Sequence, residues 1–163
     1  MDAYLDIETT GLYAECCAIT VVGILVVEHQ KELVFQYVEH DITEDNITQA
    51  LQGVSVLHTY NGTRFDLPFI KQRLGLDLER AYRHCDVMSL CHRRQLYGGL
   101  KAVERTLCIP RRHAGIDGYQ AVRLWWRYKN YYDTDALKTL LEYNLEDIAN
   151  LRLVKQKLDQ FST

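Results

Sequence analysis

The chain has 163 residues and a formal net charge of −3, with 47% hydrophobic and 25% charged residues. This composition is ordinary for a soluble globular protein. No apolar run approaches the ~20 residues of a membrane-spanning helix, and the N-terminus lacks a basic segment followed by an apolar one. We therefore expect one domain over residues 1–163, without membrane association and in the cytoplasm.

The cysteines exclude two common structural devices. Their number is odd and no Cys-x-x-Cys pair occurs, which argues against a disulfide framework and against a structural zinc site. Cys91-His92 is the one candidate ligand pair, and a half-buried structural role is favoured for it over a metal role.

The first expected element is a strand around Ala3–Ile7, ended by the turn residues Thr9-Thr10-Gly11. Asp6 and Glu8 lie two residues apart, so strand alternation places both on one face of the sheet. Like charges ~4 Å apart repel by roughly 4 kcal/mol at an effective dielectric constant near 20. A divalent cation such as Mg²⁺ or Mn²⁺ between the oxygens would relieve this repulsion. The alternative is a solvated strand end with two unremarkable acids.

Strand and helix patterns alternate over the next part of the chain. Val/Ile-rich runs predict two strands joined by a polar hairpin loop, and a helix and a short buried strand follow. This order is typical of an α+β or mixed α/β protein with one central mixed sheet. The expected elements are strands at Ala18–Val27, Leu33–Val38 and Val54–His58, a loop at Glu28–Lys31, and a helix at Glu44–Gln52 with Thr43 as N-cap.

A third acid follows the strand at Val54–His58. Asn61-Gly62 is a turn signal, and apolar residues from Phe65 to Leu74 have helical spacing. Asp66 therefore lies in the first turn of a helix at the C-terminal end of a strand, where clefts form in α/β folds. Simple helix capping would explain this acid equally well.

The segment after Asp66 is expected to contain a strand at Tyr82–Val87 and a helix at Leu100–Leu107. Asp86 ends this strand, and we expect it to cap the helix that follows. The most basic part of the chain surrounds these elements and suits either a phosphate backbone or an ordinary solvated face. Its residues are Arg93, Arg94, Lys101, Arg105, Arg111, Arg112 and His113.

Both tryptophans and four tyrosines lie between Tyr119 and Tyr132. Leu124, Trp125 and Tyr128 share one helical face, which predicts a place in the core. Whether any of these rings stacks on nucleic-acid bases is open at this point.

The last helix is expected to run from Asp133 or Thr134 to Gln160. Tyr143 and Asp147 are four residues apart and therefore lie on one face of it. An inward-facing aspartate is costly unless it is paired or metal-bound. The expected buried side of this last helix consists of Leu137, Leu140, Leu141, Leu145, Ile148 and Leu151.

Three motifs together resemble those of DnaQ-like 3′→5′ exonucleases, the DEDD group within the ribonuclease H-like fold. They are Asp6-x-Glu8, Asn61-x-x-x-Phe65-Asp66 and Tyr143-x-x-x-Asp147. Glu142 occupies the position where the histidine branch has its histidine, so the chain resembles the tyrosine branch. Leu100-Lys101-Ala102-Val103-Glu104 and Leu141-x-Tyr143-Asn144-x-x-Asp147 resemble YprB-like exonucleases most. The resemblance implies an α/β fold with a mixed five-stranded sheet of order 3-2-1-4-5, strand 2 antiparallel, flanked by helices.

The resemblance also implies a chemistry. It predicts a 3′→5′ exonuclease that hydrolyses phosphodiester bonds at 3′ ends of single-stranded DNA or RNA and releases nucleoside monophosphates. Two divalent cations, Mg²⁺ or Mn²⁺, would be bridged by Asp6. Glu8 and Asp147 would complete the first site and Asp66 the second. Tyr143 would orient or help activate the attacking water rather than act as a free base, because an unperturbed phenol titrates near ~10.

Substrate contacts follow from the same resemblance. Thr9 and Leu12 are expected at the terminal nucleotide, with Leu12 as a wedge against its base, and Asn61 is a further candidate. Phe65 is expected to pack behind Asp66 or against the sugar. Because no other recognisable segment flanks the motifs, specificity would come from this domain or from a protein partner. The alternative is a catalytically silent nucleic-acid-binding or assembly module.

Overall fold

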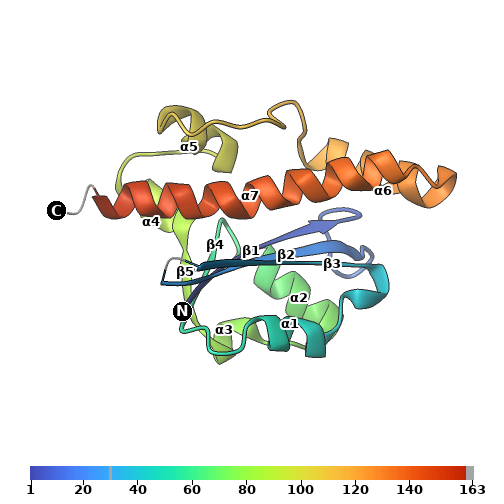
Figure 1. Ribbon diagram of the computed structural model, residues 1–163, viewed down its shortest axis with the longest axis horizontal. Coiled ribbons are helices and arrows are strands. Elements are labelled where there is room, and N and C mark those ends of the chain that lie inside the picture. The colour runs from blue at the N-terminus through green and yellow to red at the C-terminus, as the bar shows by residue number, and fades with distance from the viewer. Residues whose placement is uncertain (30, 161–163) are drawn as a thin grey trace.

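The computed structural model describes residues 1–29 and 31–160. A five-stranded mixed sheet crosses the molecule, with helices on both of its faces (Figure 1). Its order is β3-β2-β1-β4-β5, with β2 antiparallel to both neighbours and β1, β4 and β5 parallel, which confirms the predicted topology. The strands are β1 (Asp2–Thr9), β2 (Ile19–Glu28), β3 (Lys31–Val38), β4 (Val56–Thr59) and β5 (Arg83–Asp86).

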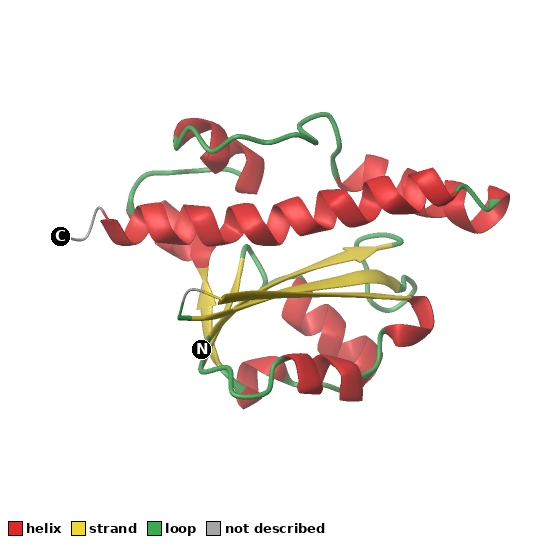
Figure 2. Cartoon of the chain, in the orientation of Figure 1, coloured by secondary structure: helices red, strands yellow, loops and turns green. Residues whose placement is uncertain are grey.

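Helices make up the rest of the regular structure, coloured red in Figure 2. They are η1 (Glu39–Asp41), α1 (Glu44–Ala50), α2 (Asp66–Leu74), α3 (Leu78–Ala81), α4 (Val87–Arg93), α5 (Leu100–Thr106), α6 (Gly118–Tyr131) and α7 (Thr134–Gln160). Helix α3 was not predicted, because one turn is too short to show a helical period. Gln30 of the expected loop at Glu28–Lys31 lies outside the described residues, and the two ends of that loop belong to the strands instead, since Glu28 of β2 pairs with Lys31 of β3.

Strand alternation divides the side chains of β1 between two cores. Ala3, Leu5 and Ile7 pack in the core on the face that carries α1 and α2. Tyr4 packs on the opposite face with residues of α7, the long helix that lies along the sheet in Figure 1. Asp6 and Glu8 share the face of Tyr4, so β1 presents both acids to α7.

The buried side of helix α7 differs from the one that the sequence predicts. Asn144, Ile148 and Leu151 are at most 1% exposed, whereas Leu145 is 37% exposed. The prediction for Leu145 was wrong, because one residue along a helix turns the side chain by about 100°. Leu145 therefore points away from the sheet that covers its neighbour.

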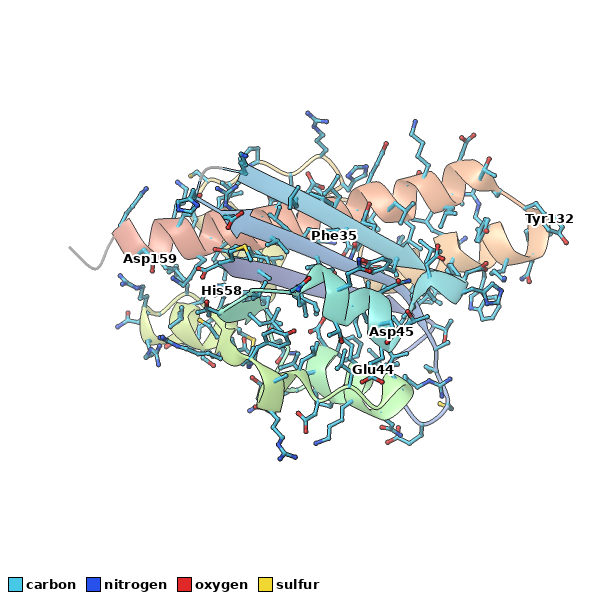
Figure 3. All side chains as sticks on the ribbon, turned by 60° about the horizontal axis from the view of Figure 1, so that its bottom comes forward. Phe35, Glu44, Asp45, His58, Tyr132 and Asp159 are labelled. Atoms are coloured by element: carbon cyan, nitrogen blue, oxygen red, sulfur yellow. The ribbon has the colours of Figure 1, made fainter. Side chains whose placement is uncertain are left out.

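Helix α6 packs beside the first half of α7 (Figure 1). Trp125 is buried at this contact, and Leu124 and Tyr128 are partly buried against the same cluster, as predicted. Tyr132 ends α6 in the left-handed conformation and projects from the tip of the α6–α7 hairpin (Figure 3). Within the part of the chain that the structure describes, no helix combines the length and apolar character needed to cross a bilayer.

Candidate functional site

Acidic side chains from three elements meet beside the end of β1. Asp6 and Glu8 come from β1 and Asp147 from α7, and one ligand atom of each lies within 4.8 Å of the others. Asp66 comes from the first turn of α2 and faces the same cleft. Four acids from three separate elements of the chain therefore share one site.

The cleft that contains these acids has a volume of about 730 Å³. Every residue predicted as catalytic, metal-binding or substrate-binding lines it. The aromatic run contributes one exposed ring, Tyr119 at the start of α6, which the sequence alone had not placed. The predicted lining residues are Asp6, Glu8, Thr9, Leu12, Asn61, Phe65, Asp66, Tyr143 and Asp147.

Burial makes the acids hard to ionise together. It is the main cause that raises the pKa of Asp6 and of Glu8 well above their usual values, and the neighbouring carboxylates raise both further. Burial also raises the pKa of Asp66 to about 7, although the Ile7 amide donates a hydrogen bond to its Oδ1 at 3.1 Å. A set of close, largely buried carboxylates fits a hard divalent cation. Mg²⁺ and Mn²⁺ require oxygen ligands, and their positive charge compensates the charge of the carboxylates.

Asn144 ties α7 to the sheet directly at Asp6. Its Nδ2 donates to Asp6 Oδ2 at 3.1 Å, and its Oδ1 accepts from Gln36 Nε2 of β3 at 3.0 Å. Gly23 of β2 pairs with Asp6, and a Cβ there would lie 2.1 Å from Asn144 Oδ1. The missing side chain of Gly23 thus allows Asn144 to lie across β2 and orient Asp6.

Tyr143 lies in the same cleft with its ring largely buried. Burial, followed by the charge of Asp147, raises the pKa of its phenol above the usual range. Burial raises the pKa of Asp147, and Arg111 and a hydrogen bond with Tyr143 oppose this rise, which fits a neutral phenol donating to a carboxylate. Lys101 Nζ lies 4.6 Å from the centroid of the Tyr143 ring and brings a cation to the site.

The basic segment is not a uniform surface patch. Arg105 and Arg112 are exposed, but the side chain of Arg111 is only 5% exposed. Arg111 donates two hydrogen bonds to Glu104, from Nε and Nη2, both at 2.6 Å, and Nη2 also donates to Asp147 Oδ1. For Arg111, both predicted alternatives were wrong: it is neither solvated nor free to track a phosphate backbone.

Asp86 has the capping role that the sequence predicted. Its Oδ1 accepts hydrogen bonds from the amides of Met88 at 3.1 Å and Asn61 at 2.9 Å, and Oδ2 accepts from Thr63 at 3.2 Å. Asn61 has a φ of 63°, a left-handed conformation that asparagine tolerates. Asp86 therefore fixes the turn that leads into Asp66.

Comparison with known protein families identifies the superfamily of this chain. Residues 3–159 match the RNase_H_2 model of the RNase_H superfamily. Among curated proteins none matches significantly.

Solved structures resemble the chain at low identity. A family B DNA polymerase from the hyperthermophilic archaeon Pyrobaculum calidifontis superposes with a TM-score of 0.71 and 16% identity, over 96% of this chain. The chain spans only 24% of that polymerase. Brucella melitensis NrnC bound to pGG has a TM-score of 0.66 and 20% identity, over 98% of this chain and 72% of NrnC. NrnC with bound Mg²⁺ superposes with a TM-score of 0.64. At these identities the likeness concerns the fold.

Proposed function

Since the chain belongs to the RNase H superfamily, we propose that it is a metal-dependent 3′→5′ exonuclease of the tyrosine branch of the DEDD group. One observation carries the proposal: the half-buried Asp6 and the buried acids Glu8 and Asp147 offer oxygens within 4.8 Å of one another in an open cleft. A covered cluster of like charges is unfavourable by itself and becomes favourable when cations bind.

The acids divide into two proposed metal sites. Asp6 serves both, Glu8 and Asp147 complete the first, and Asp66 serves the second. Two divalent ions, Mg²⁺ or Mn²⁺, would when bound stabilise the attacking and the leaving oxygen of phosphodiester hydrolysis. The structure of NrnC with bound Mg²⁺, a protein of the same fold, supports this choice of ion.

Tyr143 is proposed to orient the attacking water. Because burial keeps its phenol neutral, its oxygen carries a proton and can also accept one hydrogen bond. A raised pKa makes Tyr143 a poor general base, so its contribution is to position the water rather than to remove its proton.

The substrate we propose is the 3′ end of single-stranded DNA or RNA. Leu12 is 73% exposed at the cleft, and Thr9 holds its loop by donating to the Gly11 carbonyl oxygen at 2.6 Å. Asn61 and Phe65 lie on the α2 side of the cleft. Its volume of about 730 Å³ falls within the usual ~300–1,000 Å³ range of ligand pockets, which suits a terminal nucleotide. NrnC, solved with pGG bound, supports this substrate class.

The test is hydrolysis of labelled single-stranded DNA and RNA in Mg²⁺, Mn²⁺ or EDTA. Asp6→Asn, Glu8→Gln, Asp66→Asn and Asp147→Asn should each lower turnover by orders of magnitude, because each removes a ligand from a coupled site. Asp135→Asn, at an exposed position of α7, is the matched control and should retain activity. Hydrolysis that persists in EDTA or in Asp6→Asn would overturn the proposal.

A further inference from the structure

We propose that Glu104 and Arg111 form a clamp that positions Asp147 for metal binding. The inference rests on the proposed function, since it assigns these two residues to the metal site of the nuclease. Neither residue touches the reacting atoms in this role. Both act through the carboxylate of Asp147.

The clamp has a fixed geometry. Glu104 accepts two hydrogen bonds from Arg111, one from Nε and one from Nη2, each at 2.6 Å. The side chains of Glu104 and Arg111 are 1% and 5% exposed. A bidentate pair of this kind holds the plane of the guanidinium more firmly than a single contact would.

The backbone around Arg111 is anchored to the same turn of α7. Glu146, the residue before Asp147, accepts hydrogen bonds from the amides of Arg112 at 2.6 Å and His113 at 2.9 Å. The chain that carries Arg111 is therefore fixed relative to Asp147 independently of the Arg111 side chain.

Arg111 engages one oxygen of Asp147. Its Nη2 donates to Oδ1, while Oδ2 receives no hydrogen bond from the guanidinium in the described part of the chain. A carboxylate held in this way has one oxygen fixed and can offer the other to an ion. Hydrogen bonds to metal-ligating carboxylates commonly orient them in this manner.

Whether Arg111 supports or weakens metal binding by Asp147 depends on Glu104. An unbalanced cation beside a metal ligand would compete with the metal, but the carboxylate of Glu104 balances the charge of Arg111. What Asp147 receives is then a directed hydrogen bond with little net charge behind it. Loss of the clamp should weaken metal binding.

Stability alone does not account for the pair. Arg111 Nη1 is buried and, among the described residues, has no hydrogen-bond partner; Oε2 of Glu146 lies 4.0 Å away. Buried ion pairs are often no more stabilising than apolar residues of the same volume, and an unpaired buried donor makes them less so.

Two variants that conserve net charge test the clamp. Arg111→Lys keeps the cation but replaces the planar guanidinium with a single nitrogen, so the bidentate contact with Glu104 and the fixed direction of the hydrogen bond to Asp147 are lost. The double variant Glu104→Gln/Arg111→Gln removes both charges together. Arg112→Lys, at the exposed neighbouring position, is the matched control.

The primary readout is Mn²⁺ affinity, measured by calorimetric titration of the full chain without nucleic acid. We expect Arg111→Lys and the double variant to bind Mn²⁺ about 10- to 100-fold more weakly, and Arg112→Lys to bind like wild type. The nuclease activity of Arg111→Lys and of the double variant should recover as the Mn²⁺ concentration is raised toward saturation. A purely structural role would lower the melting temperature and leave the Mn²⁺ dissociation constant unchanged.

Unchanged or tighter Mn²⁺ binding in either folded variant would overturn the clamp. Melting curves in EDTA establish which variants are folded, and the double variant decides if Arg111→Lys is not. A wild-type chain that binds no Mn²⁺ would overturn the proposed function itself. The two failures are therefore distinguishable.

Discussion

Asp6 is the acid on which the other three converge. Burial and then the charges of Asp147, Glu8 and Asp66 raise its pKa, while the hydrogen bond from Asn144 opposes the shift. In the metal-free protein at pH 8, an ionised Asp6 therefore works against folding. When cations are bound, the same charge becomes favourable.

Asp6→Asn should invert the order of stability between two conditions. The variant should melt at or above wild type in EDTA, because a repelling charge is gone, and below wild type in Mn²⁺, because the proposed bridging ligand is lost. A ligand at ~100 times its dissociation constant stabilises a protein by roughly 2.7 kcal/mol per independent site. Thermal melts at pH 8 measure both effects, and a clearly lower melting temperature in EDTA would indicate a structural Asp6 instead.

Tyr119 is the exposed ring that the fold places at the cleft. Stacking of a base on an aromatic ring contributes ~1–3 kcal/mol, so Tyr119→Ala should raise KM roughly tenfold or more with a smaller effect on kcat. Tyr131→Ala is the control, because Tyr131 is 78% exposed but does not line the cleft. Equal kinetic effects of the two substitutions would count against stacking at Tyr119.

At the scale of elements, the contact between α7 and the sheet decides whether the acids meet. Gly23 leaves room for Asn144, and a Cβ at that position would lie 2.1 Å from Asn144 Oδ1. Gly23→Ala should therefore displace the Asn144 side chain and break its hydrogen bond to Asp6, lowering the free energy of unfolding by about 1–3 kcal/mol and weakening Mn²⁺ binding. Chemical denaturation and Mn²⁺ titration measure the two effects.

Gly115→Ala is the matched substitution, because a Cβ at Gly115 has no atom within 4 Å among the described residues. It should change neither stability nor Mn²⁺ affinity appreciably. If Gly23→Ala behaves like Gly115→Ala, the close approach of α7 at Gly23 does not hold the site together.

Local patterns in the sequence were enough to predict most elements. The apolar runs of β1 and β2 and the long leucine pattern of α7 are periodic signals that a single sequence carries. The prediction failed where the element is too short to show a period, as in α3. It also failed at the edge of a buried helix face, where a shift of one residue turns a side chain outward, as at Leu145.

The acids of the site could be predicted because each sits in a recognisable local pattern. The clamp of Glu104 and Arg111 could not be predicted in this way. Glu104 and Arg111 are seven residues apart, and Arg111 and Asp147 are 36 apart, so only the folded chain brings them together. The same holds for Asn144 and Asp6, which are 138 residues apart. For Asn144 the sequence carried two signals: its place in Leu141-x-Tyr143-Asn144-x-x-Asp147, and a glycine opposite Asp6 in the mostly apolar strand β2.

For the whole molecule, the buried acids predict an unusual dependence of stability on pH. The pKa of Asp66 is raised from 3.8 to about 7, so the folded state binds more protons than the unfolded state between these values. The free energy of unfolding of the metal-free protein should therefore fall as pH rises through this window. Asp6 and Glu8, whose pKa values are also raised, act in the same direction.

Chemical denaturation in EDTA from pH 5 to 8 checks this dependence, with Asp66→Asn as the comparison. Burial lowers the pKa of His58 and of His84, which acts in the opposite direction, so the difference between the two proteins isolates Asp66. The variant should lose less stability with rising pH than wild type. Parallel pH curves would show that Asp66 is not a strained carboxylate.

The most direct test of the proposed activity is the direction of hydrolysis. A 5′-labelled single strand incubated with the wild-type chain and Mn²⁺ should give a descending ladder of products, while the same strand with a blocked 3′ end and a circular single strand should remain intact. Asp6→Asn should leave all three substrates uncut. Cleavage inside the circle, or undiminished hydrolysis of the 3′-blocked strand, would contradict a 3′→5′ exonuclease.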